Sequence, residues 1–131
     1  MFSVLDRSTY LKGLLVLAKK DNKLVETEKD IIRDIAQRFG FSKDFYEETM
    51  RGLMANKYIG EDPVTFSDSG IARMFLQDGL KLAFADDDFD LKELEWLRKT
   101  AEANKLEKDL FESFLEEFKA ERIKQGKKIS A

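Results

Sequence analysis

The sequence predicts an all-α protein of about six helices, and three observations support this fold class. Charged residues make up 37% and hydrophobic residues 43% of the 131 positions, while proline occurs once. This composition favours amphipathic helices around one core, because it supplies both kinds of helix face and few helix breakers. Apolar residues also recur at helical spacing, and the pattern of the first half of the chain repeats in the second half. The length fits a single domain over residues 1–131.

Each helix is predicted from a stripe of apolar residues at i, i+3, i+4 spacing. In chain order the stripes run from Leu11 to Ala18, Ile31 to Phe39, Phe45 to Met54, Ile71 to Ala83, Leu94 to Ala101 and Leu110 to Phe118. Ser42 is placed to cap the third helix, and Ser67 or Ser69 to begin the fourth. Glycine and proline predict a loop at Gly60 to Pro63. The basic tail, residues 119–131, loses the apolar stripe and is expected to fray.

An internal repeat divides these helices into two units, at about residues 10–58 and 75–123. One constant shift along the chain superposes Leu17 on Leu82 and Ala18 on Ala83, and no gap is needed. The other identical pairs under this shift include Leu11 and Leu76, Asp21 and Asp86, Glu28 and Glu93, Arg33 and Arg98, Ala36 and Ala101, Lys43 and Lys108, and Asp44 and Asp109. We therefore expect two pseudo-symmetric units, each a helix, an acidic loop and two further helices, that share one core.

The composition argues against several classes of function. The chain has no histidine and no cysteine, so the commonest general base, the commonest transition-metal ligand and all thiol chemistry are missing. The net charge of −3 does not favour nucleic-acid binding. No signal peptide or transmembrane segment is apparent, since the longest apolar run, Leu14 to Ala18, is far too short. These features predict a soluble, cytoplasmic protein that is not an enzyme.

The second inter-helix loop is the strongest candidate for a ligand site. Asp86, Asp88 and Asp90 alternate as in the first half of a calcium-binding EF-hand loop, and Glu93 could close a small site for a divalent cation. The loop is not an EF-hand, however, because Leu91 and Leu97 occupy the positions where an EF-hand needs a Gly and a bidentate Glu. The competing interpretation is structural, because Asp90 and Glu93 are spaced as a helix-capping box.

The first loop is less suited to a cation, because several lysines surround it. Asp21 and Glu28, together with Asp87 of the second loop, are expected to contribute to an acidic surface around the two loops. In the last helix, Phe111, Phe114 and Phe118 form a stripe that is predicted to belong to the core. Part of this stripe would be exposed, as a surface for a partner, if the last helix lies at the rim of the bundle.

The two loops resemble those of the TerB-like, tellurite-resistance type of helical domain. The family pattern is an apolar helix ending in Ala, then Asp-Gly, an apolar residue, a small capping residue and a Glu that opens the next helix. The chain matches it as Ala18…Asp21-Asn22…Leu24…Glu28 and as Ala83…Asp86-Asp87…Phe89-Asp90…Glu93. It departs from the pattern at Asn22 and Asp87, where the family usually has Gly, and at Val25 in the capping position. The resemblance implies a compact bundle with an acidic patch and an association with stress or tellurite resistance.

Together these observations predict a non-enzymatic binding or scaffold module. The expected partner is another protein, recognised by the acidic surface around the loops, and a homodimer is a further expectation. The alternative is a divalent-cation sensor at Asp86, Asp88, Asp90 and Glu93. No cofactor is expected apart from that cation.

Overall fold

The computed structural model describes residues 2–21, 24–55, 60–85 and 91–126. Within these residues the fold consists of six α-helices and one short 3-10 helix. They are α1 (Val4–Ala18), η1 (Lys19–Asp21), α2 (Glu26–Arg38), α3 (Lys43–Ala55), α4 (Ser69–Ala83), α5 (Leu91–Ala103) and α6 (Leu110–Lys124). The structure therefore confirms the all-α class and the number of helices.

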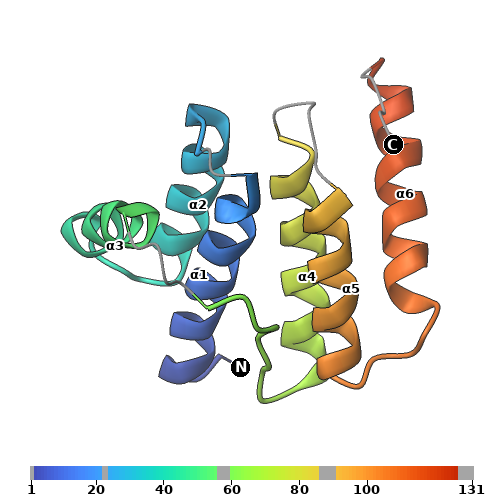
Figure 1. Cartoon of the computed structure of the whole chain (residues 1–131), viewed down its shortest axis with the longest axis horizontal. Helices are drawn as coiled ribbons and strands as arrows, with labels where there is room; N and C mark the ends of the chain where they lie inside the picture. The colour runs from blue at the N-terminus through green and yellow to red at the C-terminus, as the bar shows by residue number, and fades with distance from the viewer. Residues whose placement is uncertain (1, 22–23, 56–59, 86–90, 127–131) are drawn as a thin grey trace.

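Helices α1 and α4 lie side by side at the centre of the molecule and link its two halves (Figure 1). Helices α2 and α3 pack on the α1 side, with α3 lying across the direction of the others. Helices α5 and α6 both pack against α4, and α6 forms one edge of the molecule. The third helix of each unit packs mainly on a different neighbour. Helix α3 lies chiefly against α2 and also touches α1, whereas α6 lies chiefly against α4 and meets α5 through the Arg98–Glu112 contact.

The helix boundaries follow the sequence repeat closely. The shift that superposes Ala18 on Ala83 brings both ends of α1 onto the ends of α4, and both ends of α2 onto the ends of α5. The caps repeat as well, because the Ser3 hydroxyl accepts a bond from the Asp6 N–H (3.0 Å) and the Asp68 carboxylate accepts one from the Ile71 N–H (2.9 Å). The equivalence therefore extends from matched residues to matched helix ends.

The ends of α2 and α5 also share one backbone motif. After α2, Gly40 has φ +86° and Phe41 N–H donates to the Ala36 carbonyl; after α5, Lys105 has φ 57° and Leu106 N–H donates to the Ala101 carbonyl. Both are left-handed helix terminations of the Schellman type. The second copy uses a lysine at the position where the first uses glycine.

The fourth helix begins at Ser69, one of the two serines expected to start it, and Asp68 caps it, while the Ser67 hydroxyl donates to Asp6 (2.5 Å). One expectation about helix ends requires correction. Helix α6 continues to Lys124, into the tail that was expected to fray. It continues because Arg122 is 7% exposed and its guanidinium lies over the Phe84 ring, 5.3 Å from the centroid, which gives this turn a packing partner. The capping position of Ser42 is confirmed, since its hydroxyl accepts from the Phe45 N–H (3.2 Å).

The core is centred on the contact between α1 and α4. Tyr10 and Phe75 are fully buried, and their rings meet edge to face with centroids 5.1 Å apart. Gly13 allows this approach, because a Cβ at this position would lie 2.6 Å from Phe75 Cζ. Trp96 closes the far side of Phe75, with ring centroids 6.0 Å apart.

The segment before α4 is fastened to the bundle by three side chains. Trp96 Nε1–H donates to the Glu61 carbonyl (2.9 Å), and Asn104 bonds both the Val64 carbonyl (2.8 Å) and the Phe66 N–H (2.9 Å). The Asp6 carboxylate accepts from the backbone N–H of Ser67 (3.0 Å). The predicted loop at residues 60–63 is therefore an ordered connection that crosses from one unit to the other.

Candidate functional site

The predicted cation site lies mostly outside the described residues. Asp86, Asp88 and Asp90 of the tentative metal set, together with Asp87 of the acidic surface, fall in the interval 86–90. Asp21 ends η1, and its side chain is also outside the described part of the structure. Glu93 is described and is 2% exposed in the first turn of α5.

Glu28 occupies the position of Glu93 in the first unit and shows what this residue does structurally. Its side chain is 2% exposed, and its carboxylate accepts from the Val25 N–H (3.3 Å). Val25 has no side-chain oxygen to complete the box, so only one half of the reciprocal cap forms. Glu28 is thus a buried helix cap and differs from the exposed acid that the sequence suggested.

The described part of the chain brings together no group of three or more acidic side chains that could hold a metal ion. Acidic residues are nevertheless numerous there, and many of them are paired with arginine or lysine. The functional candidates among the described residues are therefore surfaces and grooves, and their charges decide what they could bind.

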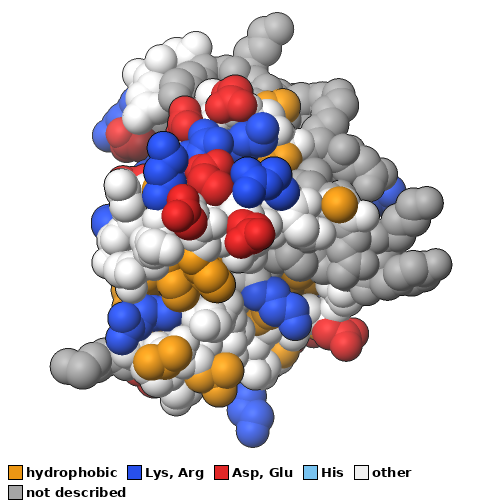
Figure 2. Space-filling view, turned by 90° about the vertical axis from the view of Figure 1, so that its left-hand side faces the viewer, with side chains coloured by type: hydrophobic (Ala, Val, Ile, Leu, Met, Phe, Trp, Pro, Cys, Tyr) orange, Lys and Arg blue, Asp and Glu red, His pale blue; other side chains and the backbone are white. Residues whose placement is uncertain are grey.

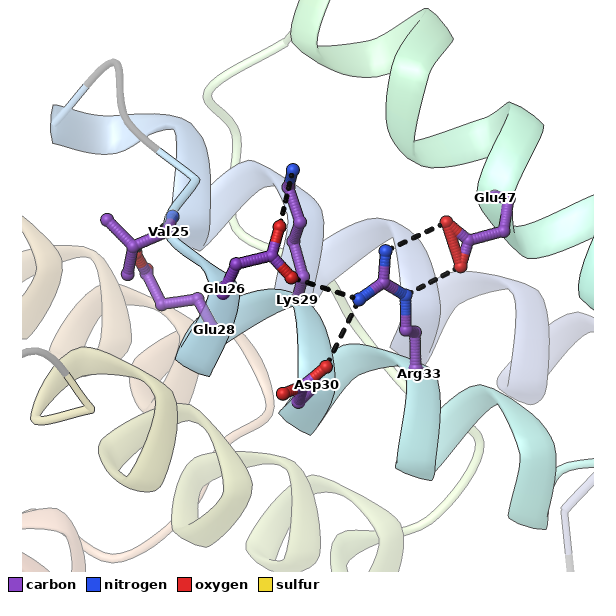
Figure 3. A network of polar contacts seen from close by, with 7 residues as sticks. All are labelled: Val25, Glu26, Glu28, Lys29, Asp30, Arg33 and Glu47. Atoms are coloured by element: carbon purple, nitrogen blue, oxygen red, sulfur yellow. Dashed lines mark hydrogen bonds and ion pairs between the residues drawn. The ribbon is translucent and has the colours of Figure 1, made fainter.

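Among the described residues, Arg33 on α2 is the centre of an ion-pair network with three carboxylates (Figure 3). Its guanidinium meets the Glu47 carboxylate of α3 through two bonds, Nε to Oε2 at 2.6 Å and Nη2 to Oε1 at 3.0 Å. The remaining nitrogen contacts Asp30 (3.1 Å) and Glu26 (3.5 Å). These bonds lower the pKa of Glu47, chiefly through the hydrogen bond from Arg33. All three guanidinium nitrogens of Arg33 thus contact carboxylates, and the two bonds to Glu47 join α2 to α3.

The second unit contains the equivalent pair. Arg98 on α5 donates from Nε to Glu112 on α6 at 2.6 Å, and these two residues match Arg33 and Glu47 in the repeat. The pKa of Arg98 is raised, mainly by this hydrogen bond. Because the pair recurs with the fold, we assign both pairs to helix–helix positioning rather than to ligand binding.

The face that carries α3 presents charges of both signs close together. Figure 2 shows this side of the molecule, with acidic and basic side chains interspersed and hydrophobic side chains beside them. Mixed charges of this kind pair with one another and leave little net field for a charged ligand. This face therefore offers no patch of one sign in the part that the structure describes.

A buried tyrosine and an aspartate form a contact that the sequence pattern did not reveal. The Tyr10 hydroxyl on α1 donates to the Asp78 carboxylate on α4, across a sequence separation of 68 residues. Burial raises the pKa of Asp78, while this hydrogen bond lowers it in part. Burial and the negative charge of Asp78 raise the pKa of Tyr10. Neither residue is repeated in the other unit, because Phe75 is equivalent to Tyr10 and Gly13 is equivalent to Asp78.

Asp78 lies at one end of a groove that runs over α4, between α2 and α6. One part, of about 320 Å³, is lined mainly by α4 and α6 and includes Asp78 and Phe114. The other, of about 490 Å³, extends to Thr27 and Ile31 on α2 and to Ala85. Both parts share the three residues Lys81, Phe118 and Glu121, so they form one continuous depression. We call it the α2–α6 groove.

The groove contains apolar side chains that are only partly covered. Phe114 and Phe118 on α6, and Ile31 on α2, are half-buried against the core. Leu80 on α4 is buried beneath them. Part of the aromatic stripe of the last helix is thus accessible, which was the alternative expected if this helix lay at the rim. Phe111 at the start of the stripe is buried, as predicted.

A separate hollow of about 750 Å³ lies beside the connection before α4. It is lined by Val16, Lys19, Lys20, Gly60, Glu61, Asp62, Pro63, Lys92, Glu95, Trp96 and Lys99. Its charges are again mixed, with Lys20 and Glu61 in contact at 3.6 Å. This hollow is polar and lacks the half-buried aromatic side chains of the α2–α6 groove.

None of the described helices is both long enough and apolar enough to cross a membrane. Comparison of the chain with protein-family models, with curated proteins and with solved structures finds no match. The resemblance to TerB-like domains consequently remains a prediction from the sequence, and the functional argument rests on the geometry of the groove.

Proposed function

We propose that this chain is a non-enzymatic binding module that takes a segment of another protein into the α2–α6 groove. The observation that carries the proposal is the partial exposure of Phe114 and Phe118, one helical turn apart, along a groove that α4 lines beside both and α2 lines beside Phe118. Accessible aromatic residues in a concave surface are typical of protein-recognition sites, where their burial supplies much of the binding energy.

The position of the groove also agrees with the surface expected from the sequence. Thr27 lies just after the first inter-helix loop and Ala85 just before the second, and both line the same end of the groove. The helix ends that adjoin the two acidic loops are therefore part of this surface. A role in stress or tellurite resistance would be exercised through such binding.

Site-specific photo-crosslinking in extracts of the cells that make the protein tests this proposal. A photoreactive residue would replace Gln77 or Gln125, both exposed and both lining the groove. A control would carry it at Glu116, which is exposed on α6 but does not line the groove. We expect one partner to be crosslinked from both groove positions and not from the control. Equal crosslinking from Glu116, or adducts from none of the positions, would contradict a binding role for the groove.

A second proposal is a divalent-cation site at the loop between α4 and α5, formed by Asp86, Asp88, Asp90 and Glu93. Its support is the alternation of Asp86, Asp88 and Asp90 in the sequence, with Glu93 in the first turn of the helix that follows this loop. The competing role is the capping contact that Glu28 makes in the first unit.

A titration of metal-free protein with Ca²⁺ and Mg²⁺ separates these two roles. The readouts are the amide NMR shifts of residues 86–93 and the fluorescence of Trp96, one turn after Glu93 on α5. Saturable shifts that disappear in an Asp86→Ala/Asp88→Ala variant would support the cation site. A flat titration to millimolar ion would leave Glu93 as a cap.

A further inference from the structure

We propose that the partner segment bound in the α2–α6 groove is a basic amphipathic helix. This inference rests on the proposed function and adds the chemical class of the partner. It follows from three properties of the groove, namely its length, the state of its backbone groups and the charge of its rim.

The length of the groove suits a helical segment of about three turns. On the α6 side its lining runs from Phe114 to Gln125. At 1.5 Å per residue this wall is about 16 Å long, which is three turns of an α-helix. The width is set by α2 on one side and α6 on the other, with α4 as the floor.

The walls of the groove favour a partner whose backbone N–H and C=O groups are hydrogen-bonded within the partner itself. One common way in which an extended peptide binds is as an added strand at a sheet edge, where free N–H and C=O groups pair with its backbone. Here α2, α4 and α6 form the walls, and their internal backbone groups are already paired within each helix. A bound helix needs no such partners, so it can bury side chains in the groove without leaving backbone groups unsatisfied.

The apolar side chains of the groove call for a matching apolar stripe. Phe114 and Phe118 are separated by one turn, and Ile31 faces the same depression from α2. A partner helix with large apolar residues at i, i+3 and i+4 would meet both walls. Its remaining positions would lie against the rim, where the charges are.

The rim of the groove is mainly acidic. Asp30, Asp78, Glu117 and Glu121 contribute carboxylates, whereas the cations are Lys81 and Arg122. Arg122 is nearly buried over the Phe84 ring, so Lys81 is the exposed cation among the described residues of this rim. Asp30 is paired with Arg33 at 3.1 Å. Glu117 and Glu121, exposed and one turn apart on α6, thus dominate the rim and favour Lys or Arg on the partner.

Binding of three designed peptides, measured by fluorescence anisotropy, tests the inference. The first is a Leu/Lys peptide of about five helical turns with leucines at helical spacing, the second replaces each Lys with Glu, and the third permutes the first so that no apolar face forms. We expect saturable binding of the Leu/Lys helix, with affinity at least about tenfold higher than for either of the others. Equal binding of the permuted peptide would overturn the helical partner, and equal binding of the Glu peptide would overturn its basic character.

Matched charge-reversal variants locate the site. Glu117→Lys/Glu121→Lys changes the rim, and Glu116→Lys/Glu102→Lys makes the same change in net charge at exposed positions that do not line the groove. The rim variant should lose about tenfold or more in affinity for the Leu/Lys helix, while the control variant should lose much less. All four positions are exposed, so both variants are expected to fold, which circular dichroism verifies. An equal loss in both would place the peptide elsewhere on the surface.

Analytical sedimentation of the protein alone tests whether a second copy of the chain, rather than a basic helix, occupies the groove. Concentration-dependent dimers that the rim variant abolishes would identify a second copy as the occupant and would overturn the basic helix. If instead no designed peptide binds while crosslinking from Gln77 and Gln125 succeeds, the groove binds a protein of another class. In that case the inference fails and the proposed function stands.

Discussion

At the scale of single residues, Asp6 is a polar group on which two separate parts of the chain depend. Its carboxylate accepts bonds from Ser3 at the start of α1 and from Ser67 before α4, although the residue is only 3% exposed. The bonds from Ser67 are the chief cause that lowers the pKa of Asp6 from 3.8 to about 2. A single ionised side chain therefore links the beginning of one unit to the beginning of the other.

Replacement of Asp6 should have an effect on stability that depends on pH. Because the pKa of Asp6 is lowered in the folded state, its contribution is complete above about pH 4 and is lost as the pH falls toward 2. We expect Asp6→Asn to lower the free energy of unfolding by about 1–3 kcal/mol at neutral pH, measured by chemical denaturation. The difference from the unchanged protein should narrow toward pH 2. A difference that stays constant over this range, or an equal effect of Asp44→Asn at the exposed start of α3, would contradict this role.

Lys105 adopts a left-handed backbone conformation that glycine normally occupies. It is exposed at φ 57°, where a side chain is disfavoured, and the equivalent position after α2 is Gly40. We predict that Lys105→Gly raises the free energy of unfolding by about 0.5–1 kcal/mol, as measured by denaturant or thermal unfolding. The reciprocal change, Gly40→Lys, should lower it by a similar amount. Destabilisation by Lys105→Gly would show that the lysine side chain contributes more than its backbone costs.

At the scale of the helices, two equivalent ion pairs join the second and third helix of each unit. They differ in exposure, because the side chains of Arg33 and Glu47 are 31% and 21% exposed, against 39% and 49% for Arg98 and Glu112. They also differ in geometry, since Arg33 binds Glu47 through two hydrogen bonds. Better-covered, bidentate pairs retain more of their electrostatic energy than exposed ones.

Double-mutant cycles should therefore give unequal coupling energies. For the Arg33→Ala and Glu47→Ala cycle we expect about 1 kcal/mol, and for Arg98→Ala and Glu112→Ala about 0.3–0.5 kcal/mol. The measurement is the free energy of unfolding of both single variants and the double variant of each pair. A larger coupling energy for the Arg98–Glu112 pair would mean that side-chain exposure does not determine which ion pair is stronger. The coupling of both pairs should decrease when salt is added.

At the scale of the whole molecule, the contact between α1 and α4 holds the two units together. Gly13 is where this contact is closest, because an added Cβ would lie 2.6 Å from Phe75 Cζ and 3.1 Å from Val64 Cγ2. The Phe75 ring is fully buried between Tyr10 and Trp96, so it has little room to move.

We predict that Gly13→Ala lowers the free energy of unfolding by about 1–3 kcal/mol, despite the higher helix propensity of alanine. The matched control is Gly52→Ala on α3, where an added Cβ would meet nothing within 4 Å. The control should gain up to about 1 kcal/mol. Thermal unfolding of both variants shows whether each substitution raises or lowers the free energy of unfolding. A stabilising Gly13→Ala would mean that α1 and α4 can separate slightly without loss.

Much of the local structure could be predicted from particular residues. Helical spacing of apolar side chains predicted all six helices, and Ser42 was identified as a cap because its hydroxyl needs only the next turn of chain. The repeat predicted that Leu17 and Leu82 occupy equivalent core positions, and both are buried. These features depend on neighbours within a few residues or on the burial of one helix face.

The candidate groove could be predicted only in part. Partial exposure of the aromatic stripe was foreseen as an alternative, but nothing in the pattern indicated that Phe118 would face Ile31 of the other unit. The roles of Asp6 and Asp78 were missed because their partners, Ser67 and Tyr10, lie 61 and 68 residues away. The start of the fourth helix at Ser69 was foreseen, whereas the cap by Asp68 and the bond from Ser67 to Asp6 were not.

The sequence by itself determined the all-helical class, the internal repeat and most helix ends, because these follow from periodicity and from short-range capping. The tertiary structure decided where the third helix of each unit packs. Helix α3 lies mainly against α2 while α6 lies mainly against α4, although Tyr46 and Phe111 are equivalent and both are buried. This difference in packing depends on how side chains far apart in the chain fit together, and a repeat in the sequence carries no information about such contacts.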